Sequence, residues 1–262
     1  MKTRKIKNLS VTDYEGFGEP LIFIHAFPLS SPMWDEQVKF FRNIYRVITY
    51  DVRGLGESYK DDNEIYTMES YAVDLISIIK EMKLENVNVC GLSMGGYILL
   101  HAYHKEPELF SRLVLADTKA SGDDNEGMKG RAAMLNKLQT EGKDFLLKDF
   151  LPKLISENGF NNSVLVKQLK EIISKNVAEG IAKAVAAIAI RLNTTENLSA
   201  ITIPTLIIIG EHDRLTPFEH SQKMNKAIPN SNMEVLKNAG HISNIENPDA
   251  FNNVLDNFLS NE

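Results

Sequence analysis

Cysteine, surplus positive charge and long apolar runs are all scarce in this sequence of 262 residues. The single cysteine, Cys90, cannot form an internal disulfide, whereas oxidised secreted domains usually carry several cysteines. No run of about 18 apolar residues is present, so we expect no membrane span. The basic start MKTRKIK is not followed by the apolar stretch of a signal peptide, so we expect a cytoplasmic location.

The overall charge excludes a further class of partner. The formal net charge is -6 at pH 7, so the chain lacks the basic surface that phosphate backbones require, and we expect no nucleic-acid partner. A hydrophobic share of 43% with 24% charged residues is typical of a globular protein, and the length suits one domain with an insertion. The cations of MKTRKIK predict the solvated start of an edge strand.

Short apolar runs of strand length recur along the chain, with helical stretches between them. They cover residues 21–26, 45–51, 86–91, 112–117, 204–213 and 232–238. Strands that are apolar on both faces and alternate with helices indicate a mostly parallel sheet with helices on both faces. The sequence therefore predicts an α/β fold.

Three helices are predicted beside these strands, at residues 67–84, 94–107 and 247–260. Thr67 is the expected N-cap of the first helix, and Pro107 cannot continue the second. Tyr71 and Leu75 begin an apolar stripe at helical spacing, which we expect to face the sheet.

About 80 residues between the fourth and fifth runs contain no strand-like stretch, which is too long for a plain connection. Four helices are predicted there, at 128–141, 143–155, 161–175 and 177–191, with Gly142, Pro152 and the stretch ENGFNNS as breaks. We interpret residues 119–198 as an all-helical cap, not an independent domain, inserted into a core formed by residues 1–118 and 199–262.

The stretch NVCGLSMGGYI places Ser93 between a strand and a helix. This strand-turn-helix pattern is typical of a nucleophile elbow, in which the serine hydroxyl stands above the sheet edge. Gly91 and Gly95 leave out side chains that would collide with neighbouring backbone in such a turn. The alternative, a structural turn with a capping serine, stays open at this point.

A serine nucleophile needs a histidine base and a carboxylate that orients it. Among the histidines, His241 is the best candidate, because it follows the last apolar run in a loop before the final helix. His25 and His212 are predicted to shape the site, His101 and His104 to lie away from it, and His220 to be a minor alternative. Asp213 follows a strand and is the preferred acid, with Asp117 as its rival, while Glu211 is less free to turn toward the site.

Acyl transfer also needs two donors for the oxyanion. The backbone N–H of Met94, directly after the serine, is one candidate. The other is the N–H of Phe27, since Pro28 has none. The helical segment is expected to set specificity and contains two arginines, Arg131 and Arg191. Arg191 could meet a substrate carboxylate or extend its charge to solvent, and Trp34 is a candidate substrate contact or core residue.

The motifs HAFPLS, YDVRGLGES, GLSMGGYI, IIIGEHDRLTP and NAGHISNIENPDAF resemble the α/β-hydrolase superfamily. The resemblance is closest to bacterial enol-lactonases, carboxylesterases and cofactor-free haloperoxidases. It implies that Ser93, Asp213 and His241 form a catalytic triad, with Phe27 and Met94 as the oxyanion hole. Hydrolysis by such a triad needs no metal and no cofactor, so we expect neither. Where the family usually has His-Gly, this chain has His25-Ala26. Asp51 and Arg53 resemble a signature loop of the family, which we interpret as structural.

The leading interpretation is hydrolysis of a small carboxylic ester or lactone through an acyl-enzyme. Carbon-carbon bond hydrolysis of dienoates is an alternative, which Leu92 disfavours because related enzymes generally have asparagine before the serine. The proline of HAFP resembles that of perhydrolases and makes peracid formation a candidate side activity. A ligand receptor without turnover is a further alternative, and assembly of several copies of the chain is left open.

Overall fold

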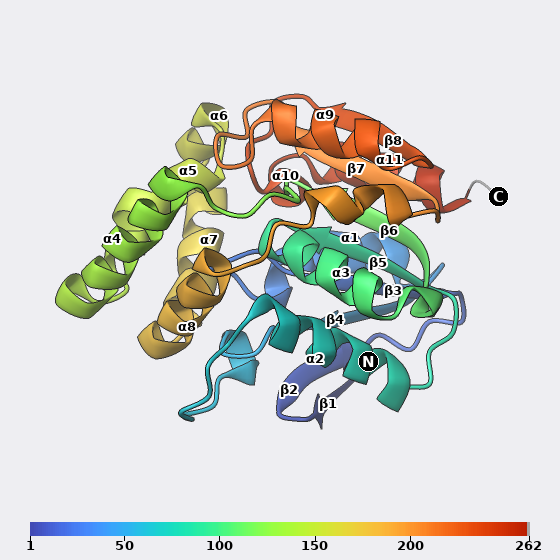
Figure 1. Ribbon diagram of the computed structural model, residues 1–262, viewed down its shortest axis with the longest axis horizontal. Helices are drawn as coiled ribbons and strands as arrows, with labels where there is room; N and C mark the ends of the chain where they lie inside the picture. Colours follow the sequence, from blue (N-terminus) through green and yellow to red (C-terminus); the bar gives the residue numbers. More distant parts are fainter. Residues whose placement is uncertain (261–262) are drawn as a thin grey trace.

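One eight-stranded sheet organises the molecule (Figure 1). The computed structural model describes residues 1–260, and within them the strand order is β1-β2-β4-β3-β5-β6-β7-β8. The strands are β1 (Lys2–Ile6), β2 (Leu9–Asp13), β3 (Pro20–Ile24), β4 (Arg46–Tyr50), β5 (Val87–Leu92), β6 (Phe110–Ala116), β7 (Thr205–Gly210) and β8 (Ser231–Leu236). Only the pairs that include β2 are antiparallel in this part of the chain. All six predicted strands are therefore confirmed, and the predicted edge strand is β1.

Helices cover both faces of the sheet. Figure 1 places α2, α3 and α9 in front of the strands, with α1 and α11 behind them. The α-helices are α1 (Asp35–Phe41), α2 (Met68–Glu81), α3 (Met94–Lys105), α4 (Asn125–Glu141), α5 (Leu151–Leu154), α6 (Glu157–Asn161), α7 (Ser163–Lys175), α8 (Ala178–Ala189), α9 (Phe218–Ala227), α10 (Ser243–Glu246) and α11 (Pro248–Ser260). No helix within residues 1–260 has both the length and the apolar character that crossing a bilayer requires.

Local sequence explains where α2 begins. The Thr67 hydroxyl accepts a hydrogen bond from the Ser70 N–H, and the Ser70 hydroxyl accepts one from the Thr67 N–H, each at 3.0 Å. This reciprocal capping satisfies two donors that the first turn would otherwise leave unpaired. Tyr71 and Leu75 are buried, so the predicted apolar stripe and the predicted N-cap are both confirmed.

The parallel strands bring their carboxyl ends to one edge of the sheet. The register pairs Ile24 with Gly91, Leu92 with Ala116 and Gly210 with Leu236, which are the last or nearly the last residues of their strands. The turns after β3, β5, β6, β7 and β8 therefore leave from the same edge. Polar groups collect at this edge in sheets of this type.

Helices α4 to α8 lie between β6 and β7 in sequence and form a group at the left of Figure 1. Two details differ from prediction. The expected helix at 143–155 is a π-helical turn at Leu146–Phe150 followed by the short α5, in which Pro152 supplies no N–H. The stretch ENGFNNS contains α6, because Ser156 caps it by accepting a hydrogen bond from the Gly159 N–H. The division into core and cap stays an interpretation.

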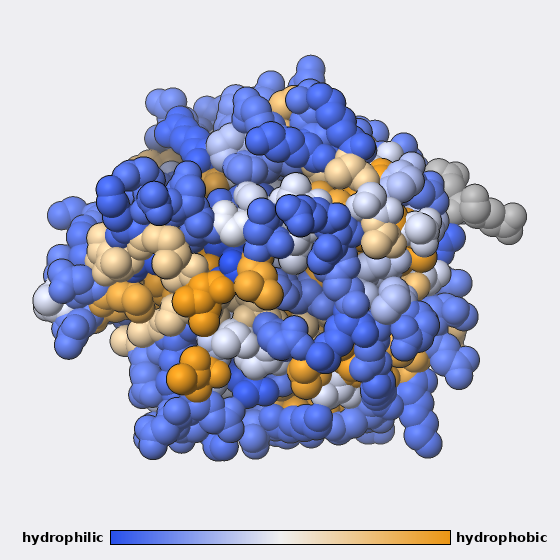
Figure 2. All heavy atoms as spheres, viewed as in Figure 1, coloured by the Kyte–Doolittle hydropathy of each residue, from blue (hydrophilic) through white to orange (hydrophobic). Residues whose placement is uncertain are grey.

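Most of the face in Figure 2 is hydrophilic, and hydrophobic side chains gather over the helical group at its left. Between α4 and α8 this surface is hollowed by a groove of about 400 Å³. The residues that line the groove include Leu135, Leu138, Ala178 and Ala182.

Polar contacts that are buried or partly buried join the helical group to the rest of the chain. The Asn176 amide donates to the Pro28 carbonyl at 2.8 Å and accepts from the Gly56 N–H at 2.6 Å. The Glu246 carboxylate accepts hydrogen bonds from the Ser156 hydroxyl at 2.6 Å and from the Gly240 N–H at 2.6 Å. Because buried polar groups are costly to leave unpaired, these contacts fix the position of the helical group.

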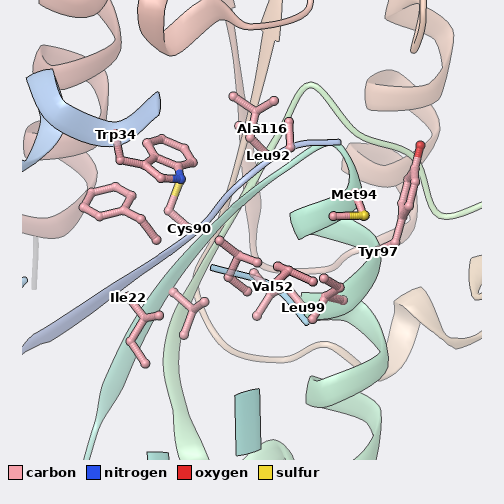
Figure 3. Close-up of a cluster of buried hydrophobic side chains, with 14 of the residues drawn as sticks. Ile22, Trp34, Val52, Cys90, Leu92, Met94, Tyr97, Leu99 and Ala116 are labelled. Atoms are coloured by element: carbon pink, nitrogen blue, oxygen red, sulfur yellow. The ribbon is translucent and has the colours of Figure 1, made fainter. Parts of the chain in front are cut away.

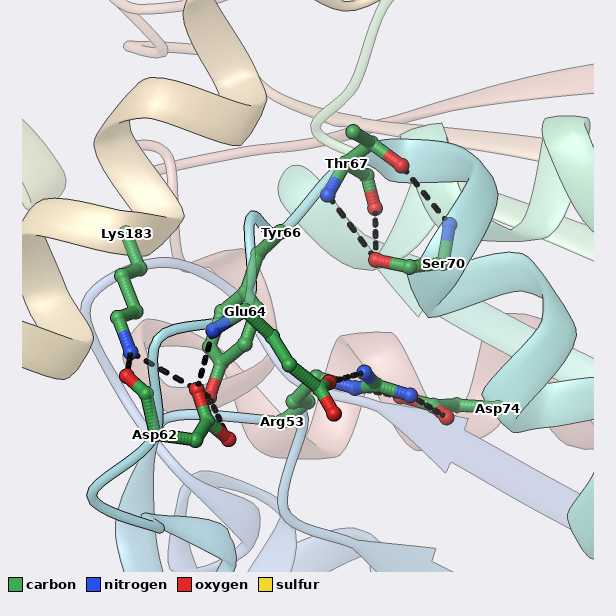
Figure 4. Close-up of polar contacts among 8 residues, drawn as sticks. All are labelled: Arg53, Asp62, Glu64, Tyr66, Thr67, Ser70, Asp74 and Lys183. Atoms are coloured by element: carbon green, nitrogen blue, oxygen red, sulfur yellow. Dashed lines mark hydrogen bonds and ion pairs between the residues drawn. The ribbon is translucent and has the colours of Figure 1, made fainter.

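A second polar cluster holds the loop after β4 (Figure 4). The Arg53 guanidinium donates to both carboxylate oxygens of Asp74, at 2.9 and 2.6 Å, and to Glu64 at 2.7 Å. Nearby, the Lys183 ammonium of α8 binds the carboxylate of Asp62 at 2.9 Å. Arg53 therefore has a structural role, as the motif interpretation expects.

Arg53→Met is expected to lower the free energy of unfolding by about 2 kcal/mol or more, because the Asp74 carboxyl, 3% exposed, loses the charge and the two hydrogen bonds that stabilise it. Lys105→Met is the matched control, since the Lys105–Glu69 pair is exposed and its loss costs less than about 1 kcal/mol. Urea unfolding of both variants measures the difference. Equal losses would contradict a stabilising role for the Arg53 pair.

Candidate active site

Ser93 occupies a strained turn between β5 and α3. Its φ and ψ are 55° and -113°, a conformation that residues other than glycine rarely adopt. The Ser93 N–H donates to the Ala116 carbonyl at 2.9 Å, and the Ser93 carbonyl accepts from the Thr118 hydroxyl at 2.8 Å. A Cβ at Gly91 would lie 2.4 Å from the Gly95 carbonyl oxygen, so the glycine at position 91 is required for this turn.

A chain of hydrogen bonds connects Ser93, His241 and Asp213. The Ser93 Oγ lies 2.7 Å from His241 Nε2, and His241 Nδ1 lies 2.8 Å from Asp213 Oδ2. The three residues are separated by up to 148 positions in sequence and are each at least 92% buried. The structure therefore brings together the three residues that the motifs single out.

The turn after β7 prepares the Asp213 carboxylate for this contact. Asp213 lies three residues beyond the end of β7, and its carboxylate accepts hydrogen bonds from the Leu215 and Thr216 N–H groups. The Thr216 hydroxyl adds a third, at 2.5 Å. Burial alone would raise the pKa of Asp213, but the charge of His241 and these hydrogen bonds lower it, so the carboxylate stays ionised.

The contact between Asp213 and His241 raises the pKa of His241, whereas it lowers that of Asp213. Burial alone would lower the pKa of His241, but the charge and the hydrogen bond of Asp213 raise it above the usual 6.5. When His241 is neutral, a proton on Nδ1 donates to Asp213 and leaves Nε2 free to accept from Ser93. This is the tautomer that a base for the serine hydroxyl requires.

Asp117, the rival acid, does not bond to His241. Its carboxylate accepts from the Gly210 N–H at 2.7 Å and from the Ser243 hydroxyl at 2.5 Å. Full burial and the nearby charge of Asp213 raise the pKa of Asp117. Asp117 therefore ties β6 to the end of β7, which precedes the loop of the acid Asp213, and to the start of α10, which follows the loop of the base His241.

Two backbone donors lie beside the Ser93 hydroxyl. Met94 is the first residue of α3, and Phe27 lines the same cavity as Ser93. Across residues 1–260, neither of these two N–H groups has a protein acceptor within hydrogen-bonding distance. Free N–H groups at a helix start and in the adjoining loop are what an oxyanion hole consists of.

The other histidines lie outside the hydrogen-bonded chain. His25 is fully buried, and its Nε2 accepts from the Val52 N–H at 2.8 Å, so it braces the loop after β4. His212 is part exposed beside Glu211, and His220 lies on α9. His101 and His104 lie in the second half of α3. These placements agree with shaping or peripheral roles.

The cavity at Ser93 is small and carries positive charge. Its volume is about 60 Å³, and it is lined by Phe27, Ser93, Tyr97, Lys119, Arg131, Phe150, Ile188, Leu215, Thr216 and His241. A larger hollow of about 600 Å³ lies at the opposite edge of the sheet, near Arg112, Pro204 and Asn230. Cavity size alone would therefore have pointed to the wrong edge, because the hydrogen-bonded chain is at the smaller cavity.

Two candidate substrate contacts lie outside that cavity. Trp34 is fully buried, with its ring 4.8 Å from that of Phe23, and Figure 3 shows it on the side of the strands away from Tyr97. Arg191 is also buried. Its guanidinium lies 4.4 Å from the centre of the Tyr97 ring and bonds to Asp123 at 2.8 Å. Neither side chain is among the residues that line the cavity in the described part of the chain.

Sequence reasoning gave no role to Thr216, Glu246 and Lys119, and it named Arg131 only as one of two arginines in the helical segment. The spacing of Thr216, three residues after Asp213, is a local signal that could have found it. Glu246 gives no such signal for its contact with the helical group, since Ser156 lies 90 residues away in sequence. Among residues 1–260, no three histidine, cysteine or acidic side chains are grouped closely enough to hold a metal ion.

Residues 19–248 match the family model described as the alpha/beta hydrolase fold, and the chain belongs to that family. It is similar to 3-oxoadipate enol-lactonase 2 of Acinetobacter baylyi, with 29% identity over 93% of this chain and 91% of that protein. A non-heme chloroperoxidase of Kitasatospora aureofaciens is 29% identical over 86% of each chain. A malate-bound esterase from Thermogutta terrifontis matches with a TM-score of 0.92 and 30% identity over 99% of this chain and 98% of that chain. The resemblance predicted from the motifs is confirmed.

Proposed function

We propose that this protein is a serine hydrolase that cleaves a carboxylic ester or lactone of a small substrate. The observation that carries the proposal is the hydrogen-bonded chain from Ser93 through His241 to Asp213. The similarity to an enol-lactonase and an esterase supports the same class of bond, since both act on a carbonyl bonded to oxygen.

In the first step the Ser93 Oγ attacks the substrate carbonyl while His241 Nε2 takes its proton. The carbonyl oxygen becomes an oxyanion, which the N–H groups of Phe27 and Met94 stabilise. His241 then gives the proton to the leaving alkoxide, and the acyl group stays on Ser93. Water, deprotonated by His241, attacks the acyl-enzyme, releases the acid and restores the serine. In a lactone the alcohol remains attached to the acyl group.

The helical group between β6 and β7 acts as a cap in this proposal. Phe150 and Ile188 reach the cavity from it and supply an apolar wall beside Ser93. Such a wall excludes water and strengthens the electrostatic contacts to the oxyanion.

Ser93→Ala is expected to lower kcat/KM for p-nitrophenyl acetate by about 10³-fold or more, because the nucleophile is lost.

Asp213→Asn is expected to lower kcat by about 10⁴-fold, since the amide cannot hold the required tautomer of His241. Asp117→Asn is the matched control and should stay within about tenfold of the unchanged protein, because Asp117 does not bond to His241.

A panel of p-nitrophenyl esters and lactones, with Ser93→Ala as the blank, measures these rates. Equal rates for the protein and the blank on every substrate would sink the hydrolase proposal. A larger loss in Asp117→Asn than in Asp213→Asn would reverse the assignment of the acid.

The pH dependence follows from the raised pKa of His241. Only the neutral imidazole can accept the Ser93 proton, so kcat/KM should be full above the pKa of the folded protein and fall as the pH drops through it. Since that pKa is raised, the midpoint of the acid limb is expected above pH 6.5. Initial rates from pH 5 to 9 at constant ionic strength give the profile. A midpoint below pH 6.5 would contradict the assigned effect of Asp213.

Peracid formation is a second candidate activity, in which hydrogen peroxide replaces water as the acceptor of the acyl group. Similarity to a chloroperoxidase supports it, and so does Pro28 beside the Phe27 N–H. Hydrogen peroxide with acetate should then give peracetic acid above the Ser93→Ala blank. No peracid above that blank would remove this candidate.

A further inference from the structure

Three cations surround one carboxylate beside the Ser93 cavity. The Asp123 carboxylate accepts from Arg191 at 2.8 Å and from Arg131 at 3.0 Å, and the Lys119 ammonium lies 3.4 Å away. The Asp123 side chain is 3% exposed. Burial alone would raise the pKa of Asp123, but the hydrogen bonds and charges of the arginines lower it well below its usual value, so it is ionised.

One carboxylate cannot balance three cations, so the cluster carries two uncompensated positive charges. Arg191 is used structurally, because its guanidinium also donates to the Ile188 and Ser121 carbonyls and lies over the Tyr97 ring. Its Nε is buried and has no partner within residues 1–260. The unbalanced charge therefore falls to Lys119 and Arg131.

Lys119 and Arg131 both line the cavity that contains the Ser93 hydroxyl, and the lining includes no acidic side chain in the described part of the chain. Their side chains are only 16% and 22% exposed. This low exposure leaves both cations poorly solvated, and burial together with the neighbouring Arg191 lowers the pKa of Lys119. Poorly solvated cations bind an anion more strongly than surface cations do.

The Asp213 carboxylate does not neutralise the positive charges of Lys119 and Arg131. It lies behind His241, on the Nδ1 side, and its oxygens are taken by His241, Thr216 and the Leu215 N–H. A buried cation without a matching anion is costly, which leaves Lys119 and Arg131 able to bind an anion that enters the cavity.

We propose that the substrate is a short ester or lactone that carries a carboxylate, which Lys119 and Arg131 bind while its carbonyl meets Ser93. This rests on the proposed hydrolase function. The cavity of about 60 Å³ limits the link between carbonyl and carboxylate to a few heavy atoms.

Chain-matched substrates test this. Monoethyl succinate, which carries its carboxylate on the acyl side, is compared with ethyl butyrate, in which a methyl group replaces that carboxylate. 3-Acetoxypropionate, which carries its carboxylate on the alcohol side, is compared in the same way with propyl acetate. Proton release at constant pH gives kcat/KM for each. In at least one pair, kcat/KM for the charged ester is expected to be about tenfold higher than for its neutral match. This ratio of the two kcat/KM values should fall as salt is added.

Lys119→Met and Arg131→Met are each expected to lower that ratio about tenfold. Lys129→Met is the matched control: it removes a cation from the same helix, α4, but Lys129 is 74% exposed and pairs with Glu126 outside the cavity. If Arg131→Met does not fold because Asp123 loses a partner, Lys119→Met and the salt dependence of the unchanged protein carry the test.

Calorimetric binding to the Ser93→Ala variant separates this proposal from the hydrolase proposal. Monoethyl succinate or 3-acetoxypropionate should bind more tightly than its neutral match, and Lys119→Met should remove the difference. Cleavage of the neutral esters with no preference for either charged ester, in rate or in binding, would overturn the carboxylate proposal alone. No cleavage of any ester above the blank, with charged binding retained, would overturn the hydrolase function alone.

Discussion

The positive φ of Ser93 is the constraint on which the site depends. The turn holds the hydroxyl above the sheet edge only because β5 and β6 on one side and α3 on the other leave the backbone no alternative. A Cβ at Gly91 or Gly95 would meet backbone oxygen atoms at 2.4 and 2.3 Å. Packing of the surrounding strands and helix therefore offsets the strain of the Ser93 backbone conformation.

Everything else at the site is placed relative to that turn. Parallel strands deliver the loops with Asp213 and His241 to the same edge, and Asp117 ties β6 to the end of β7 and to the start of α10. Glu246 binds the N–H of Gly240 and the hydroxyl of Ser156, so one carboxylate positions both the histidine loop and the helical group. The loop that carries the imidazole and the helical group that supplies the apolar wall are therefore held by the same carboxylate.

The elements that the sequence predicts correctly depend on interactions between residues that are close in sequence. The capping residue Thr67, the stripe that begins at Tyr71 and the alternation of apolar runs with helices all act within a few residues. Helix α6 and the π-helical turn at Leu146–Phe150 were not predicted, because neither the Ser156 cap nor the change in helical hydrogen bonding shows in the spacing of apolar residues. The residues of the hydrogen-bonded chain could be named from motifs, but their distances could not.

The sequence by itself determined the family, the type of sheet and the identity of Ser93, His241 and Asp213, because these follow from local patterns and from motifs that the family shares. The tertiary structure alone decided which cations face the serine. Arg191 was the expected contact, yet packing against Tyr97 and Asp123 buries it, while Lys119 and Arg131 line the cavity. Side-chain direction depends on contacts between α4, α8 and the sheet edge, and such long-range contacts leave no local pattern in the sequence.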